Sequence, residues 1–233
     1  MLSAEVSVAG ERLLLHPHRA LFWPRRGWLV VSDLHLGKAT HLRKGGAALP
    51  EGSDARTLER LDEVIATFRP QRIVLLGDLF HSSLNTAWDR VADWSLRQDA
   101  PLHLVPGNHD MLADRRYAEA GIHVCDEAVK EGPFVFTHEA EEHHGSYVIS
   151  GHVHPGVLLA GRGRQKLRLP CFRFGVRTGI LPAFGLPTGL HCEGLRPGIR
   201  TFACTPNAVI DVSSNSTALV APEQTRPGHG RTR

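Results

Sequence analysis

The chain has 233 residues, of which 42% are hydrophobic, so it can bury one substantial core and leaves room for at most a small second domain. Its formal net charge of +3 is too small to identify a nucleic-acid-binding protein, although it is compatible with an anionic substrate. The four cysteines form no CxxC pair, so the sequence predicts neither a zinc ribbon nor a disulfide framework.

Short apolar runs that are rich in Val and Ile, and that end at Gly, Pro or polar residues, predict buried strands. In chain order these runs cover residues 28–32, 72–76, 102–105, 134–136 and 147–149. Between the first two runs, Leu58, Leu61 and Ile65 recur at helical spacing and predict a helix over residues 54–68. Further helices are predicted over residues 88–98 and 112–120, the second stopped by Gly121.

After His154 the sequence changes to short segments separated by Gly and Pro, which predicts an antiparallel sheet with no further long helix. The segments cover residues 157–160, 167–174, 199–203 and 209–212. We interpret residues 1–212 as a single catalytic domain. Residues 213–233 are dominated by Ser, Thr, Pro, Gly and Arg, and we expect a disordered tail there.

The sequence shows neither a secretory signal pattern at its N-terminus nor a membrane-spanning stretch, and the predicted localisation depends on both observations. Glu5 and Glu11 interrupt the basic and then apolar pattern of a secretory signal. No apolar stretch approaches the roughly eighteen residues of a membrane-spanning helix. We therefore expect a soluble, cytoplasmic protein without membrane contact.

A polar cluster follows each of the five predicted strands. The clusters are Asp33-Leu34-His35, Gly77-Asp78, Gly107-Asn108-His109-Asp110, Thr137-His138 and Gly151-His152-Val153-His154. In an α/β sheet the loops that leave the carboxyl ends of strands converge on one crevice, so these side chains are expected to meet. Asp, Asn and His supply ligands of the number and kind that two adjacent metal ions need.

Asp78 is the best candidate for a ligand shared by two metals. Gly77 lets the backbone bend tightly and leaves the Asp78 carboxylate free to bridge two cations about 3.5 to 4 Å apart, a separation suited to phosphoryl chemistry. His152 and His154 would then serve one metal each. Any one cluster has an ordinary explanation as a turn, but five in this order, each after an apolar strand, are hard to obtain by chance.

This ordered set of clusters resembles the calcineurin-type metallophosphoesterases over residues 28–155. The resemblance implies an α/β fold, a four-layer αββα sandwich with mixed sheets, and a two-metal site at the edge of the sheets. It also implies the ligands of each metal. One metal would be held by Asp33, His35, Asp78 and His154, and the other by Asp78, Asn108, His138 and His152.

A narrower resemblance, reaching to residue 212, concerns the substrate. The motifs that carry it are Ser32-Asp33-Leu34-His35-Leu36-Gly37-Lys38, Gly45, Pro50-Glu51-Gly52, Leu169-Pro170-Cys171-Phe172 and Leu181-Pro182-Ala183-Phe184-Gly185. They resemble the DNA-ligase-associated phosphoesterase group called PdeM. This implies a DNA-repair endonuclease or phosphodiesterase that works beside a ligase, a helicase-like protein and a nuclease. A homodimer is a family-level expectation, because the groove of one small domain is short for a polynucleotide.

The remaining polar residues suggest how the reaction would proceed. His109 follows a metal ligand and suits a general acid that protonates the departing alkoxide, with Asp110 orienting its imidazole. Lys38, Arg43 and His81 are candidates for substrate binding. Mixed oxygen and nitrogen ligands suit manganese, iron or zinc, with manganese favoured in at least one position.

Two rival functions stay open. One is a small-molecule or nucleotide-lipid pyrophosphohydrolase, since lipid A precursor hydrolases share the Ser-Asp-Leu-His-Leu start but carry an inserted lid. No long amphipathic insertion appears between Asp110 and His138, which weakens this reading. The other is a non-catalytic scaffold on the same fold, which should have lost ligands, whereas none is missing here.

Overall fold

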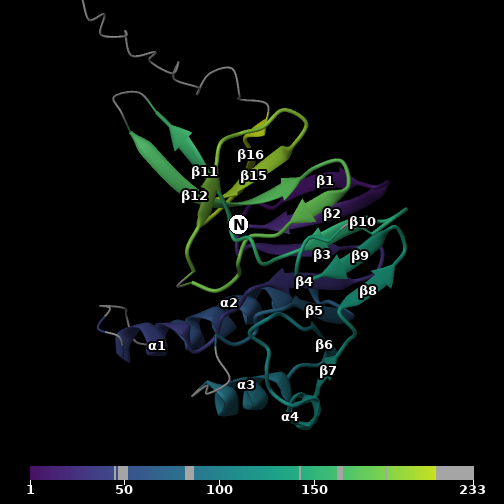
Figure 1. Cartoon of the computed structure of the whole chain (residues 1–233), viewed down its shortest axis with the longest axis vertical. Helices are drawn as coiled ribbons and strands as arrows, with labels where there is room; N and C mark the ends of the chain where they lie inside the picture. The colour runs from purple at the N-terminus through teal and green to yellow at the C-terminus, as the bar shows by residue number, and fades with distance from the viewer. Residues whose placement is uncertain are drawn as a thin grey trace, which may run out of the picture.

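The computed structural model describes residues 1–44, 46, 52–81, 87–141, 143–161, 165–186 and 188–213. The predicted tail therefore lies outside the described residues except for Ser213. Two β-sheets pack against each other, and the helices lie against the outer face of one of them (Figure 1). No helix of the described residues is long and apolar enough to cross a membrane.

The first sheet has seven strands in chain order. They are β1 (Ala4–Val8), β2 (Glu11–His16), β3 (Ala20–Trp23), β4 (Trp28–Ser32), β5 (Arg72–Leu76), β6 (Leu102–Val105) and β7 (Ile122–Val124). β1 to β4 pair antiparallel, whereas β4 to β7 pair parallel. β4 and β5 are continuous apolar runs because both of their faces are covered.

Helices cover one face of this sheet. They are α1 (Lys38–Lys44), α2 (Ser53–Phe68), α3 (Trp88–Ser95) and α4 (Asp114–Glu119). α2 buries Leu58, Leu61 and Val64, which share one helical face. It ends at Arg69, which adopts a left-handed conformation and donates its backbone N–H to Ile65, ahead of Pro70.

The second sheet has nine strands and faces the first. They are β8 (Ala128–Glu131), β9 (Phe134–Thr137), β10 (Tyr147–Ser150), β11 (Pro155–Ala160), β12 (Lys166–Phe174), β13 (Thr178–Ile180), β14 (His191–Glu193), β15 (Arg200–Cys204) and β16 (Val209–Asp211). Their order is β14-β11-β12-β13-β10-β9-β8, and β15 pairs with β12 and β16. β9 and β10 pair parallel, as do β10 and β13.

Aromatic side chains fill the space between the two sheets. Trp23 of the first sheet meets Phe134 of the second edge to face, with ring centroids 4.9 Å apart. Phe136, Phe172 and Phe202 are buried in the same core. Each such side chain contributes about 1.5 to 3 kcal/mol by leaving water, so this layer fixes how the sheets sit on each other.

The α/β fold with two mixed sheets is confirmed, and so are the five predicted strands and three predicted helices. α3 stops at Ser95 rather than at residue 98, and α4 begins at Asp114 rather than at residue 112. Four elements near the start, β1 to β3 and α1, were not predicted. The sheet after His154 is mixed rather than antiparallel, because β13 joins β10 and β14 joins β11 in parallel.

The two mixed sheets pack face to face as expected, and the helices lie on the outer face of the first sheet. No α-helix follows α4 among the described residues, so the layers there are helices, first sheet and second sheet. The segment from Pro155 onward has no helical periodicity and forms strands instead. A small cluster that includes Val157, Cys171, Ala203 and Leu195 forms a separate core within this segment.

Candidate metal centre

The five polar clusters leave the carboxyl ends of strands that are neighbours in their sheets. β4, β5 and β6 are adjacent and parallel in the first sheet, and β9 and β10 are adjacent and parallel in the second. Two distances show that the clusters of the two sheets meet. His154 Nε2 lies 3.3 Å from Asp33 Oδ1, and His138 Nε2 lies 3.5 Å from Asp78 Oδ1.

Asp33, His35 and His154 form what we call the first metal group. Each offers a ligand atom, and these atoms all lie within 4.8 Å of one another. His35 Nε2 and His154 Nε2 are 3.1 Å apart. Asp33 Oδ1 is buried and has no hydrogen-bond partner among the described residues, which is costly for a carboxylate oxygen. A cation at this position would satisfy it, so the residues present fit a divalent metal.

Asp78, His138 and His152 form the second metal group, whose ligand atoms also lie within 4.8 Å of one another. His138 Nδ1 lies 3.0 Å from the Leu76 carbonyl oxygen, which can only accept a hydrogen bond. Nδ1 therefore carries the proton, and the free Nε2 faces Asp78 and His152. This is the tautomer that a metal-ligating histidine requires.

The Asp78 carboxylate belongs to the second metal group and also faces His35 of the first. Its Oδ2 is 3.7 Å from His35 Nε2, and its Oδ1 is 3.5 Å from His138 Nε2. Asn108, the remaining predicted ligand, is exposed and lines a cavity of 430 Å³ together with His138. The arrangement brings six of the seven predicted metal ligands into these two groups, and the seventh, Asn108, lines the same cavity as His138.

The backbone at these ligands is strained in a consistent way. Five of the seven predicted ligands adopt positive φ angles in the left-handed region, which non-glycine residues rarely do. They are Asp33 (φ 53°), His35 (φ 47°), Asp78 (φ 50°), His152 (φ 65°) and His154 (φ 50°). Such strain persists only where surrounding contacts enforce it, and it gathers at functional sites.

Glycines in the clusters allow the ligands to approach closely. A Cβ atom on Gly77 would lie 2.2 Å from His138 Nδ1, and one on Gly151 would lie 2.5 Å from Asp33 Oδ2. Real side chains do not tolerate such distances. Gly77 and Gly151 are therefore required by the packing of the ligands themselves, in addition to the bend at Gly77, where φ is 70°.

The two predicted catalytic residues have different surroundings. His109 Nε2 lies 4.0 Å from Asp78 Oδ2, and the His109 side chain is 41% exposed, so it borders the centre and remains open to a substrate. Asp110 does not orient His109. Its carboxylate instead accepts backbone N–H groups of Gly107 at 3.0 Å and Leu79 at 3.0 Å. It thereby ties the loops after β5 and β6 together.

Burial explains the electrostatics of Asp110 and the first metal group. Burial raises the pKa of Asp110 to about 6, against the opposing effect of the Gly107 N–H. Burial also raises the pKa of Asp33, but contact with His154 holds that pKa below its ordinary value. Burial and then Lys38 lower the pKa of His35 to about 3, so its imidazole is neutral and able to bind a metal at neutral pH.

The three predicted substrate-binding residues separate into two sets. The imidazole of His81 stacks on that of His109, with ring centroids 5.6 Å apart. Lys38 is half-buried and interacts electrostatically with the Asp78 and Asp33 carboxylates. Arg43 lies on α1, where it donates to Thr40 Oγ1 and lines a different cavity. Lys38 and His81 thus border the centre, whereas Arg43 lines a separate cavity.

One segment has a structural role that the sequence did not reveal. The residues after β13 connect the ends of both sheets, because the backbone N–H of Leu181 donates to Ser150 and that of Phe184 donates to Ser32. The N–H of Gly185 donates to the Asp33 carbonyl at 3.1 Å, and a Cβ atom there would lie 2.2 Å from the Leu34 oxygen. These are backbone contacts, so only the motif resemblance singled the segment out.

The chain is similar to known proteins in both sequence and structure. The family model described as calcineurin-like phosphoesterase matches residues 28–136. A nuclease from Pseudomonas putida named MPE is 30% identical, with a TM-score of 0.76, and the match covers 90% of this chain and 99% of that one. A phosphoesterase from E. coli named YfcE is 15% identical over 83% of this chain and 96% of that one, with a TM-score of only 0.37. No curated protein matches the sequence.

The chain belongs to the calcineurin-like phosphoesterase family. The resemblance recognised in the polar clusters is therefore confirmed, and the PdeM-like group is consistent with the similar nuclease. Proteins of this family are phosphoester hydrolases that bind divalent metals, and the two metal groups are the candidate sites for them in this chain.

Proposed function

We propose that this protein is a two-metal phosphodiesterase that cleaves DNA. The observation that supports this most directly is the position of Asp78, whose two carboxylate oxygens face His35 of the first metal group and His138 of the second. A carboxylate shared in this way suits a pair of cations about 3.5 to 4 Å apart. The likeness to a protein named as a nuclease supports a nucleic-acid substrate.

Ligand chemistry favours manganese, with iron or zinc as alternatives. Asp33, Asp78 and Asn108 offer oxygen and the four histidines offer nitrogen, a mixed set that manganese accepts readily. When bound, two such ions activate a water molecule and polarise the phosphoryl oxygens that it attacks.

His109 is the residue we assign to proton donation. Its imidazole borders the centre from the side of Asp78 and is accessible to solvent, so Nε2 can reach the oxygen of a departing alkoxide. The His109 backbone N–H donates to Asp78 Oδ1 at 3.1 Å, which fixes the position of the loop relative to the shared carboxylate. The His81 ring stacks on the His109 imidazole and limits its rotation.

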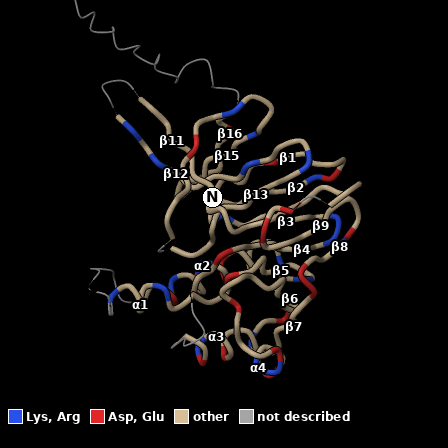
Figure 2. The backbone as a smooth tube through the Cα atoms, viewed as in Figure 1, with Lys and Arg blue, Asp and Glu red and all other residues tan. Residues whose placement is uncertain are grey.

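Charge around the centre suggests where a polynucleotide lies. Lys38 acts electrostatically on His35 and His81, whereas Glu127, Glu139 and Glu141 line the 430 Å³ cavity beside Asn108. Over the rest of the described residues, positions of both signs are interspersed (Figure 2). We infer that the phosphate backbone approaches along Lys38 and His109, because the glutamates would repel it.

A role in DNA repair beside a ligase, a helicase-like protein and a nuclease is the further proposal that the flanking motifs support. The Leu181–Gly185 motif forms backbone hydrogen bonds to Ser32 and Asp33, so it holds the loop that carries the first predicted metal ligand. Homodimerisation and a cytoplasmic location remain predictions from the sequence.

The test is a substrate panel with the purified full chain and manganese. It compares bis(p-nitrophenyl) phosphate, p-nitrophenyl phosphate, single- and double-stranded DNA and a nucleotide-lipid pyrophosphate, with the Asp78→Asn variant as the control. We expect turnover of the diester and of DNA, with DNA binding that weakens as salt rises. Cleavage of the pyrophosphate while the diester and DNA stay intact would overturn the nuclease assignment and favour the pyrophosphohydrolase.

A further inference from the structure

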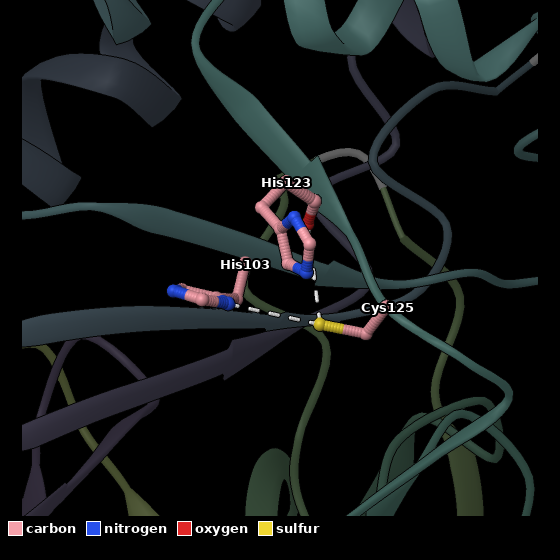
Figure 3. A group of neighbouring side chains, drawn as sticks. All are labelled: His103, His123 and Cys125. Carbon is pink, nitrogen blue, oxygen red and sulfur yellow. Dashed lines mark hydrogen bonds between the residues drawn. The ribbon is translucent and has the colours of Figure 1, made fainter.

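A second set of metal-ligating side chains lies outside the metal centre. His103 projects from β6, His123 from β7, and Cys125 follows β7 directly. β7 is the edge strand of the seven-stranded sheet, and His103 pairs with His123 in its register. Figure 3 shows the three side chains gathered at one point of this edge. We call them the edge cluster.

The three side chains share one face of the sheet. Leu102 and Leu104, on either side of His103, pack towards the helices, so His103 points to the opposite face. Ile122 packs towards the helices as well, which places His123 on the same face as His103. Alternation along two neighbouring strands thus brings both imidazoles together, and the turn after β7 adds the thiol.

The donor atoms of the edge cluster have the spacing that one ion requires. All three ligand atoms lie within 4.8 Å of one another, and Cys125 Sγ is 3.8 Å from His103 Nδ1. Tetrahedral zinc with Zn–S near 2.3 Å and Zn–N near 2.05 Å would separate sulfur from nitrogen by about 3.6 Å. For the Cys125–His103 pair, a movement of a few tenths of an ångström would therefore suffice.

The chemistry of the donors differs from that of the metal centre. The centre offers only oxygen and nitrogen, whereas the edge cluster adds a thiol, which selects thiophilic ions such as zinc. His123 is exposed, and His103 and Cys125 are partly exposed, so an ion can reach them from solvent. The His103 and His123 rings meet edge to face, at 69° and with centroids 5.1 Å apart, and are not stacked.

We propose that His103, His123 and Cys125 form a binding site for one thiophilic transition-metal ion, with zinc as the natural occupant, separate from the metal centre. The Cys125 thiol loses its proton to solvent when the ion binds, and water completes the fourth position. Such an ion would fasten the three-residue edge strand β7 to β6. β6 leads directly into the loop with Asn108 and His109, so the site would stabilise one wall of the metal centre.

The experiment uses cobalt as a spectroscopic substitute in the full chain, because thiolate-to-cobalt charge transfer gives an absorption band that oxygen and nitrogen ligands do not. Cobalt is titrated into the wild type, Cys125→Ser and the matched control Cys192→Ser, with bound equivalents counted by equilibrium dialysis. Cys192 is the other partly exposed thiol and lies outside the cluster. We expect the absorption band in the wild type and in Cys192→Ser. In Cys125→Ser the band should be absent, and the protein should bind one equivalent of cobalt fewer.

A second variant keeps the test independent of folding. His123 is exposed, so His123→Ala should fold normally. We expect the zinc affinity of this variant, measured by displacement of bound cobalt, to be at least about tenfold lower than that of the wild type. A wild-type chain without the band, a band that survives Cys125→Ser, or one that disappears with Cys192→Ser would each overturn the proposal.

Discussion

The two metal groups are built from similar residues but differ in how the protein supports them. In the first group, Asp33 and His35 are buried, and Asp33 Oδ1 has no hydrogen-bond partner among the described residues. In the second group, His138 is anchored to the Leu76 carbonyl, and the side chain of His152 is 41% exposed. The first group is therefore the more enclosed, whereas the second has one ligand, His152, that is open to solvent.

This difference indicates a division of roles. We expect that an ion held in the enclosed group would exchange slowly with solvent and would stabilise the fold, because it would satisfy a buried carboxylate oxygen. An ion in the open group exchanges readily and lies beside the cavity that Asn108 and His138 line. Asp78 links the two groups, so the comparison depends on it most.

The largest effect is expected from Asp78→Asn. Asparagine keeps the shape and can still accept the His109 N–H, but it removes the charge that two cations would share. We expect turnover to fall about a thousandfold, since metal assistance supplies several kcal/mol of transition-state stabilisation. Steady-state kinetics and metal content by mass spectrometry provide the measurement. Full activity in this variant would contradict the two-metal mechanism.

The next effect concerns His109. His109→Ala should slow cleavage of DNA or another diester with a poor leaving group about a hundredfold, because the departing alkoxide is no longer protonated. Bis(p-nitrophenyl) phosphate, whose leaving group needs little protonation, should be slowed far less. His41→Ala, a histidine on α1 in contact with His81, is the matched control. An equal loss on both substrates would exclude His109 as the general acid.

A smaller effect separates the two metal groups by kinetics. With a chelator in excess, we expect one equivalent of metal to leave at least about ten times faster than the other. Activity should disappear with the fast equivalent, and the midpoint of thermal unfolding should fall mainly with the slow one. Stopped-flow detection of released metal and differential scanning fluorimetry would follow both. Simultaneous release would show that burial does not distinguish the groups.

The parts of the molecule that the sequence predicted share one property. β4, β5 and β6 are apolar runs, interrupted in β6 only by His103, and polar residues with side-chain chemistry follow them, so both the strand and the cluster are visible in the sequence. β1 alternates inward Val6 and Val8 with outward Glu5 and Ser7, a weaker signal over five residues, and α1 has only seven residues.

The features that escaped prediction depend on contacts between distant residues. Asp110 accepts a hydrogen bond from the Leu79 N–H, 31 positions away in the chain. No local sequence pattern distinguishes an aspartate that ties two loops together from one that orients His109. The edge cluster forms only because β6 and β7 pair in register, which places His103 beside His123. Neither arrangement has a characteristic spacing in the sequence, since the register of the sheet creates both.

The smallest effect would test the enclosure of the first group through its pH dependence. Burial, followed by Lys38, lowers the pKa of His35 to about 3, whereas the unfolded chain takes up this proton near its ordinary value of 6.5. Between these values the unfolded state binds more protons, so the stability of the metal-free protein falls as the pH falls through that window. His35 alone should contribute about 1 kcal/mol per pH unit.

Urea unfolding of the metal-free protein at several pH values between about 6 and 4 measures this slope. His35→Gln should reduce the slope by the contribution of one proton, while above pH 7 the slopes of the two proteins should coincide, because both states of His35 are then neutral. An unchanged slope in the acid range would mean that water reaches His35 in the absence of metal. The first group would then be as open as the second, and the contrast between them would arise only when metal is bound.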